Sequence, residues 1–96
     1  MGYVAPLDAV EFSTNQVHRF ITEDCHFPVT ITKVELAAAT GELKSVRATR
    51  HNRYSRRMAL EWLESLGVHI DWEVAAAEAE REVLGTVAAQ LASPRF

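Results

Sequence analysis

Hydrophobic residues first recur at helical spacing between residues 14 and 24, three and four positions apart, as on one face of a helix. Ser13 precedes them and Gln16 follows three residues later, a capping box in which each side chain bonds the other's backbone N–H. Pro28 disfavours helical backbone at the residue before it, so the helix must end earlier. We therefore predict a helix over residues 14–24. Its apolar stripe consists of Val17, Phe20 and Ile21.

A second helix is predicted soon after Pro28. Thr30 or Thr32 can serve as its N-cap, and Thr32 with Glu35 makes a further capping box. Gly41 suits the position after the last turn, because glycine adopts left-handed backbone at little cost. Two short helices joined by a tight turn indicate a helix-turn-helix motif. The inward face of this second helix consists of Val34, Ala37 and Ala38.

The next segment favours strands. Between residues 44 and 48 the less polar Val46 and Ala48 alternate with polar residues, as in a half-buried strand. Residues 49–52 suit a turn, with Asn52 tolerant of positive φ, and residues 53–55 form a return strand. Basic residues recur here every three positions, as on a helix, but no apolar stripe accompanies them. We therefore predict a β-hairpin.

Two more helices complete the pattern. Ser55 is the N-cap of a helix that ends at Gly67, and Asp71 caps a last helix of about 20 residues, rich in Ala and Glu. Gly85 lies inside this last helix and weakens it. The stripe of the third helix consists of Ala59, Trp62, Leu63 and Leu66, and that of the last helix of Val74, Ala77, Leu84, Ala88 and Leu91.

Charge is concentrated in one segment of the chain. The 96 residues hold 10 Lys and Arg against 13 Asp and Glu, a net charge of −3. Residues 44–57 contain six of these cations and no acid, so the window carries +6 and the other 82 residues carry −9. Such a patch attracts polyanions whatever the net charge, because the local field governs encounter.

The order helix, turn, helix, basic hairpin, helix is that of a winged helix-turn-helix. In that fold the second helix enters the major groove, and a basic hairpin reaches along the DNA backbone or into the minor groove. The candidate DNA-binding residues of the second helix are Thr30, Thr32, Lys33 and Glu35. Those of the hairpin and its flanks are Lys44, Arg47, Arg50, His51, Asn52, Arg53, Arg56 and Arg57, and those at the start of the first helix are Asn15 and Gln16.

One domain is expected from this length, mainly α-helical with a small β-hairpin wing. Residues 1–11 show no clear period and are predicted to be a loose arm or a short edge strand. Residues 12–67 form the predicted winged helix-turn-helix DNA-binding domain. Residues 68–96 form the predicted C-terminal helix and tail, whose small residues permit packing on its own domain or on a second protomer.

One stretch of this sequence matches a known motif. The matching residues are Gly41-Glu42-Leu43-Lys44-Ser45-Val46-Arg47, then Arg50, Arg53, Tyr54 and Arg56, then Leu60-Glu61-Trp62-Leu63. In this order they resemble the excisionase group of MerR-like winged-helix proteins, and the resemblance extends over about residues 12–66. The chain departs from that group in its recognition helix, where Lys33 is the sole cation, and at the hairpin tip, where His51 and Asn52 stand in place of basic or aromatic residues.

The resemblance implies a role in recombination. Excisionases are recombination directionality factors of phages and other mobile elements. They bind repeated sites beside an attachment site and bend the DNA, so that integrase excises the element. They perform no covalent chemistry, and the resemblance implies neither an enzyme nor a cofactor. The implied partners are double-stranded DNA, a phage integrase and further copies of the protein through the C-terminal helix. A small winged-helix repressor and a protein-interaction adaptor are the alternatives.

Other classes of site find little support in the sequence. Cys25 is the single cysteine, which excludes an internal disulfide and suits a reducing compartment. Its spacing from His18 and His26 matches no common zinc pattern, so we expect a part-buried thiol, surface histidines and no metal. No basic leader opens the chain, and the uncharged run over 83–94 is too short to span a membrane. We expect a cytoplasmic protein that acts on DNA in a bacterial host.

Overall fold

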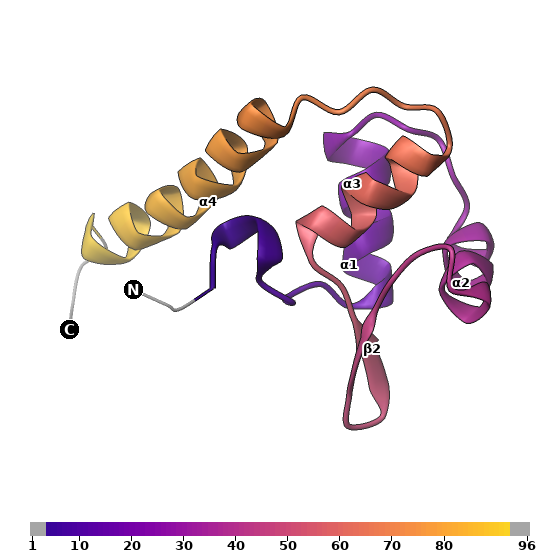
Figure 1. Cartoon of the computed structure of the whole chain (residues 1–96). Coiled ribbons are helices and arrows are strands. Elements are labelled where there is room, and N and C mark those ends of the chain that lie inside the picture. The colour runs from indigo at the N-terminus through magenta and orange to yellow at the C-terminus, as the bar shows by residue number, and fades with distance from the viewer. Residues whose placement is uncertain (1–3, 93–96) are drawn as a thin grey trace.

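A computed structural model describes the backbone of residues 4–92 and the side chains of residues 4–83. It is mainly helical with a small two-stranded antiparallel sheet, which confirms the predicted helix-rich class with a hairpin (Figure 1). The helical elements are η1 (Pro6–Asp8), α1 (Thr14–Arg19), η2 (Phe20–Asp24), α2 (Ile31–Thr40), α3 (Arg56–Ser65) and α4 (Trp72–Ala92). The strands are β1 (Val46–Ala48) and β2 (His51–Arg53).

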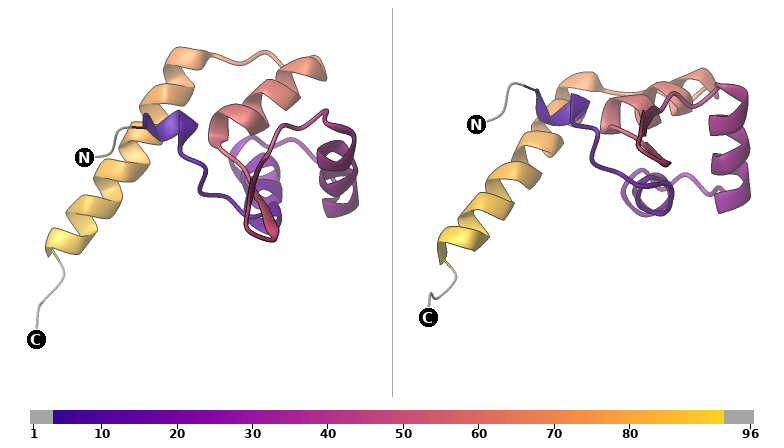
Figure 2. Two further views of the ribbon diagram at one scale, coloured as in Figure 1. Left: turned by 60° about the horizontal axis from the view of Figure 1, so that its bottom comes forward. Right: turned by 90° about the horizontal axis from the view of Figure 1, so that it is seen from below.

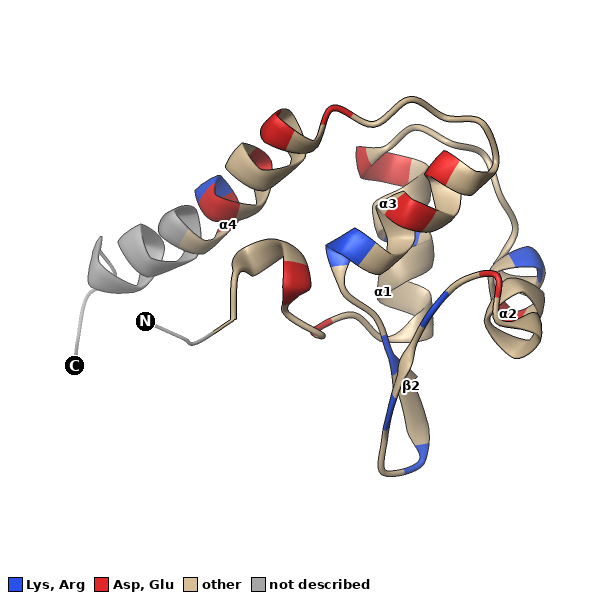
Figure 3. Cartoon of the chain, in the orientation of Figure 1, with Lys and Arg blue, Asp and Glu red and all other residues tan. Residues whose placement is uncertain are grey.

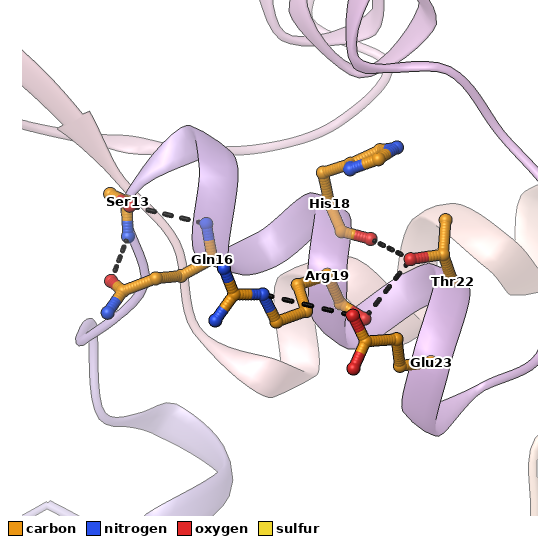
Figure 4. A network of polar contacts seen from close by, with 6 residues as sticks. All are labelled: Ser13, Gln16, His18, Arg19, Thr22 and Glu23. Atoms are coloured by element: carbon orange, nitrogen blue, oxygen red, sulfur yellow. Dashed lines mark hydrogen bonds and ion pairs between the residues drawn. The ribbon is translucent and has the colours of Figure 1, made fainter.

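The first predicted helix has its predicted bounds but changes type along its length. The capping box is present: Gln16 N donates to Ser13 Oγ over 3.3 Å, and Ser13 N donates to Gln16 Oε1 over 2.9 Å (Figure 4). From Phe20 to Asp24 the backbone is π-helical and forms η2. The Thr22 hydroxyl donates to the carbonyl oxygen of His18 over 2.9 Å, and such side-chain bonds to the preceding turn tend to bend helices.

Residues 25–30 connect η2 to helix α2, which ends where the sequence predicts. Thr30 is its N-cap, since its Oγ1 accepts a bond of 3.1 Å from Lys33 N. Thr32 lies within the helix, so the alternative capping box of Thr32 with Glu35 was wrong. Gly41 follows the helix with φ +85°, the left-handed conformation expected there. Of the predicted inward residues, Val34 and Ala37 are buried and Ala38 is half-buried.

The hairpin is confirmed, with a tighter turn than predicted. Val46 pairs with Arg53 and Ala48 with His51, which leaves a loop of two residues rather than four. The positive φ falls at Thr49, at +57°, and not at Asn52, which lies within β2. β1 is exposed along its whole length, so the prediction of a half-buried strand was wrong. The physical reason is that the hairpin projects from the helices as a free arm (Figure 1).

Helix α3 buries the predicted stripe except at its end. Ser55 is itself buried, and its Oγ accepts from Met58 N over 3.1 Å. Leu66 is exposed because it follows the last turn as the C-cap. Gly67 then turns the chain with φ +98°, as expected for the residue after a helix. The buried residues of this stripe are Ala59, Trp62 and Leu63.

Helix α4 is continuous over Trp72–Ala92, through Gly85, and Asp71 caps it by accepting from Val74 N over 3.2 Å. The face that packs inward is not the predicted stripe: Ala79 is buried, whereas Val74 and Ala77 are exposed. Packing against η1 selects the alanine face instead. The remaining residues of that stripe, Leu84, Ala88 and Leu91, lie outside the described side chains.

The described part of the N-terminal arm, residues 4–11, is docked rather than loose. η1 packs against both α3 and α4, and its Leu7 is buried in the core. Phe12 forms an isolated antiparallel bridge with Tyr54, through two backbone hydrogen bonds of 2.9 Å. The arm therefore covers the face of α3 that would otherwise meet water, and it ties the start of α1 to the base of the hairpin.

The far half of helix α4 extends past η1, away from the other helices (Figures 1 and 2). The hairpin and α2 lie at the end of the molecule opposite this extension in the same views. Within the described part of the chain, none of the helices combines the length and the hydropathy needed to cross a membrane.

Candidate nucleic-acid interface

Four cations of the hairpin region are free of internal partners. Lys44, Arg47 and Arg50 are exposed, and Arg53 is half-buried at the end of β2. Their side chains form no ion pair or hydrogen bond with any residue that the structure describes. Figure 3 shows these cations along the projecting hairpin, while acidic residues occupy η1, η2, α3 and α4. The hairpin is therefore a region of unbalanced positive charge.

A groove joins the hairpin to the start of α1. It is open, encloses about 450 Å³, and brings residues 13–15 next to residues 47–53. Asn15 is exposed in this groove, as a DNA-contacting residue must be. Gln16 lies outside it, on a neighbouring groove beside Arg19, and its Oε1 already accepts the capping bond from Ser13. The structure thus brings Asn15 to the hairpin and separates Gln16 from it.

The predicted recognition residues lie on the exposed side of α2. Thr32, Lys33 and Glu35 are all exposed. Thr30 is exposed as well, but its hydroxyl oxygen is engaged in capping the helix. Thr30 and Lys33 also line a wide groove beside Leu66. This side of α2 therefore presents few cations of its own.

Arg56 and Arg57 have internal partners, unlike the four hairpin cations. The Arg56 side chain is only 12% exposed, and its guanidinium lies 5.0 Å from the Phe20 ring centre and 5.4 Å from that of Phe12. Glu11 Oε1 lies 4.0 Å from Arg56 Nε. A cation over two aromatic faces contributes to packing, and its low exposure leaves little of the guanidinium open to an outside partner.

Arg57 forms a clasp with the N-terminal arm. Its Nε donates to Asp8 Oδ1 over 2.5 Å, and a second nitrogen donates to Oδ2 over 3.4 Å. This bond to Asp8 raises the pKa of Arg57. The same guanidinium lies over the ring of Trp72, whose Nε1 donates to Glu64 over 2.9 Å. The clasp joins η1, α3 and α4 on the side away from the hairpin.

The cysteine and histidines have local roles. Cys25 is half-buried as predicted, and burial raises its pKa to about 11, so the thiol stays protonated at neutral pH. His18 is half-buried rather than on the surface, and its Nε2 lies 2.7 Å from the Val29 carbonyl oxygen, which holds the loop before α2. Among the described residues, no three His, Cys, Asp or Glu side chains are grouped as metal ligands.

Two residues near the candidate interface, the half-buried Thr14 and the exposed Leu36, were missed by the sequence reasoning. Thr14 lines the hairpin groove, and its hydroxyl lies 3.5 Å from that of Tyr54. Leu36 is exposed on α2. Helical spacing offered a signal for Leu36, because it lies about 160° around the helix from the buried Val34.

Comparison of the chain with protein-family models, with curated proteins and with solved structures finds no match. What this face can do chemically follows from its own geometry. Guanidinium groups on an extended hairpin can each donate several hydrogen bonds to phosphate oxygens, and α2 adds a second surface of groove-sized width.

Proposed function

We propose that this chain is a winged helix-turn-helix protein that binds double-stranded DNA. In this proposal α1 and α2 are the helix-turn-helix, α2 is the recognition helix, and β1 with β2 is the wing. The observation that carries the proposal is the set of cations on the projecting hairpin, which have no internal partners among the described residues. Unpaired arginines on a protruding element favour a polyanionic partner of extended shape.

The hairpin would hold the DNA backbone. Arg47, Arg50 and Arg53 line one groove with Asn15, so a phosphate group entering it meets charged and neutral donors together. Arg50 is one of the two residues of the turn, at the tip that would reach furthest along the DNA or into the minor groove. These contacts position the protein and carry no sequence information directly.

The remaining surface would keep binding confined to one face. The helices away from the hairpin carry carboxylates, among them Glu64 on α3 and Glu78 on α4 (Figure 3). Carboxylates repel phosphate, so this side of the molecule would face away from DNA. It also supplies a surface to which a basic protein can bind.

We further propose that the protein acts as an excisionase, binding beside an attachment site and bending the DNA toward excision. This proposal rests on the motif between Gly41 and Leu63 and on the free hairpin cations. The partner would be an integrase, and neighbouring protomers would meet through α4, whose Val74 is 54% exposed. A head-to-tail contact of this kind would extend along repeated DNA sites.

An excision assay tests this function. The genes that neighbour this chain's gene are searched for an integrase and attachment sites. These are combined with the purified protein, and excision and integration products are measured. We expect the protein to shift the products toward excision, and we expect the double variant Arg50→Ala, Arg53→Ala to lose this effect because the wing no longer holds phosphate.

The matched control is Arg81→Ala. Arg81 is also an exposed arginine, but it lies on α4 and pairs with Glu78 over 3.0 Å. This variant should keep full directionality if α4 acts through its apolar residues. An unchanged product ratio with tight DNA binding would contradict the excisionase role and favour a repressor on the same fold. Absence of DNA binding at low salt would favour a protein-interaction adaptor.

A further inference from the structure

The exposed side of α2 has an apolar centre. At about 100° per residue, Leu36 lies about 160° from Val34 around the helix axis, with Thr32 one turn before it. Val34 is fully buried, and the Leu36 side chain is 57% exposed, so Leu36 occupies the middle of the outer face. Ala39 is exposed on the next turn. These three residues form an uncharged ridge along α2.

Lys33 and Glu35 flank this ridge on opposite sides, and both are exposed. Their charges cancel, so the outer face of α2 has no net charge with which to attract phosphate. Its contribution to DNA binding must come from short-range contacts with base edges. This differs from the hairpin, where positive charge dominates.

Only one group in the major groove matches an exposed leucine. Every base pair presents hydrogen-bond donors and acceptors there, but the thymine C5-methyl is the apolar group on the base edges. Resting on the proposed function, we propose that Leu36 contacts thymine methyl groups and makes the protein select thymine where α2 meets the base edges.

This ridge is too small to be the main contact with a protein partner. One leucine and one alanine form a far smaller apolar patch than the ~800 Å² that each partner buries in a stable interface. Helix α2 also lies toward the same end of the molecule as the basic hairpin, away from the far half of α4 (Figure 2). A basic element beside an uncharged helix face fits DNA, which offers phosphates and base edges side by side.

The test is a two-by-two comparison of protein and DNA. Binding sites are first selected from a random duplex pool with the wild-type protein. Each thymine of the selected site is then replaced by deoxyuridine, which removes only the methyl group. We expect one or two of these replacements to weaken wild-type binding about four-fold each, the effect of uncovering one methyl-sized group. Leu36→Ala should bind more weakly and should not respond to the same replacements.

Val4→Ala is the matched control, because Val4 is as exposed as Leu36 and lies in the N-terminal arm, outside the proposed DNA-binding and self-association surfaces. It should respond to deoxyuridine as the wild type does. The inference is overturned if wild-type binding is indifferent to every replacement, or if Leu36→Ala is as sensitive as the wild type. Tight binding in those cases leaves the DNA-binding proposal intact, whereas a pool that yields no bound DNA at low salt overturns both. The wild-type arm does not depend on the folding of any variant.

Discussion

At the scale of single residues, arginines that are neighbours in the sequence make different contacts. Arg53 lies at the hairpin groove, Arg56 covers two phenylalanine rings, and Arg57 binds Asp8, 49 residues earlier in the chain. The density of cations could be predicted from the sequence. The sequence could not predict which cations lack internal partners. Those partners come from the N-terminal arm, whose sequence shows no periodicity.

Replacing Arg56 tests this division of roles. We expect Arg56→Ala to lower the free energy of unfolding by about 1–2 kcal/mol, because a desolvated cation–π contact and the packing of its methylene stem are lost together. Arg50→Ala, at the exposed turn, should change it by less than ~0.5 kcal/mol. Urea unfolding followed by circular dichroism measures both. Equal stabilities of the two variants would contradict the packing role of Arg56 over the two phenylalanine rings.

At the scale of elements, the ends of the helices were the most predictable feature. Ser13 and Ser55 cap the helices that follow them, because each hydroxyl oxygen accepts a hydrogen bond from a backbone N–H that has no partner within the helix. The hairpin turn was less predictable, because Thr49 adopts positive φ without a glycine or asparagine to announce it. The inward face of α4 was mispredicted, because packing against η1, and not the helix's own apolar spacing, decides which of its residues are covered.

Gly41 offers a test at this scale. An added Cβ would meet no atom within 4 Å, so Gly41→Ala should act only through the left-handed backbone, at a cost of about 1 kcal/mol. For a chain of this length that loss corresponds to a fall in Tm of roughly 4–8 °C. Glu42→Ala, at the next and exposed position, should leave Tm within about 2 °C. A Gly41→Ala protein as stable as the wild type would show that the turn after α2 relaxes.

At the scale of the whole molecule, positive charge is concentrated on the element that projects from the helices. The free cations project on the hairpin, and the acidic helices and α4 lie toward the other end (Figure 3). The charge asymmetry was visible in the sequence, as one acid-free window in an acidic chain. The docking of the arm and the direction of α4 were not, because both depend on contacts between segments far apart in sequence, such as Asp8 with Arg57.

The central claim is that the hairpin cations bind DNA phosphates, and the salt dependence of binding tests it most directly. Affinity for duplex DNA is measured by mobility shift over a series of salt concentrations for the wild type, for single Arg47→Ala, Arg50→Ala and Arg53→Ala variants, and for Arg81→Ala. Each hairpin variant should reduce the slope of log affinity against log salt by about 0.9 per lost phosphate contact, and Arg81→Ala should leave it unchanged. Hairpin variants that retain the wild-type slope would contradict the claim.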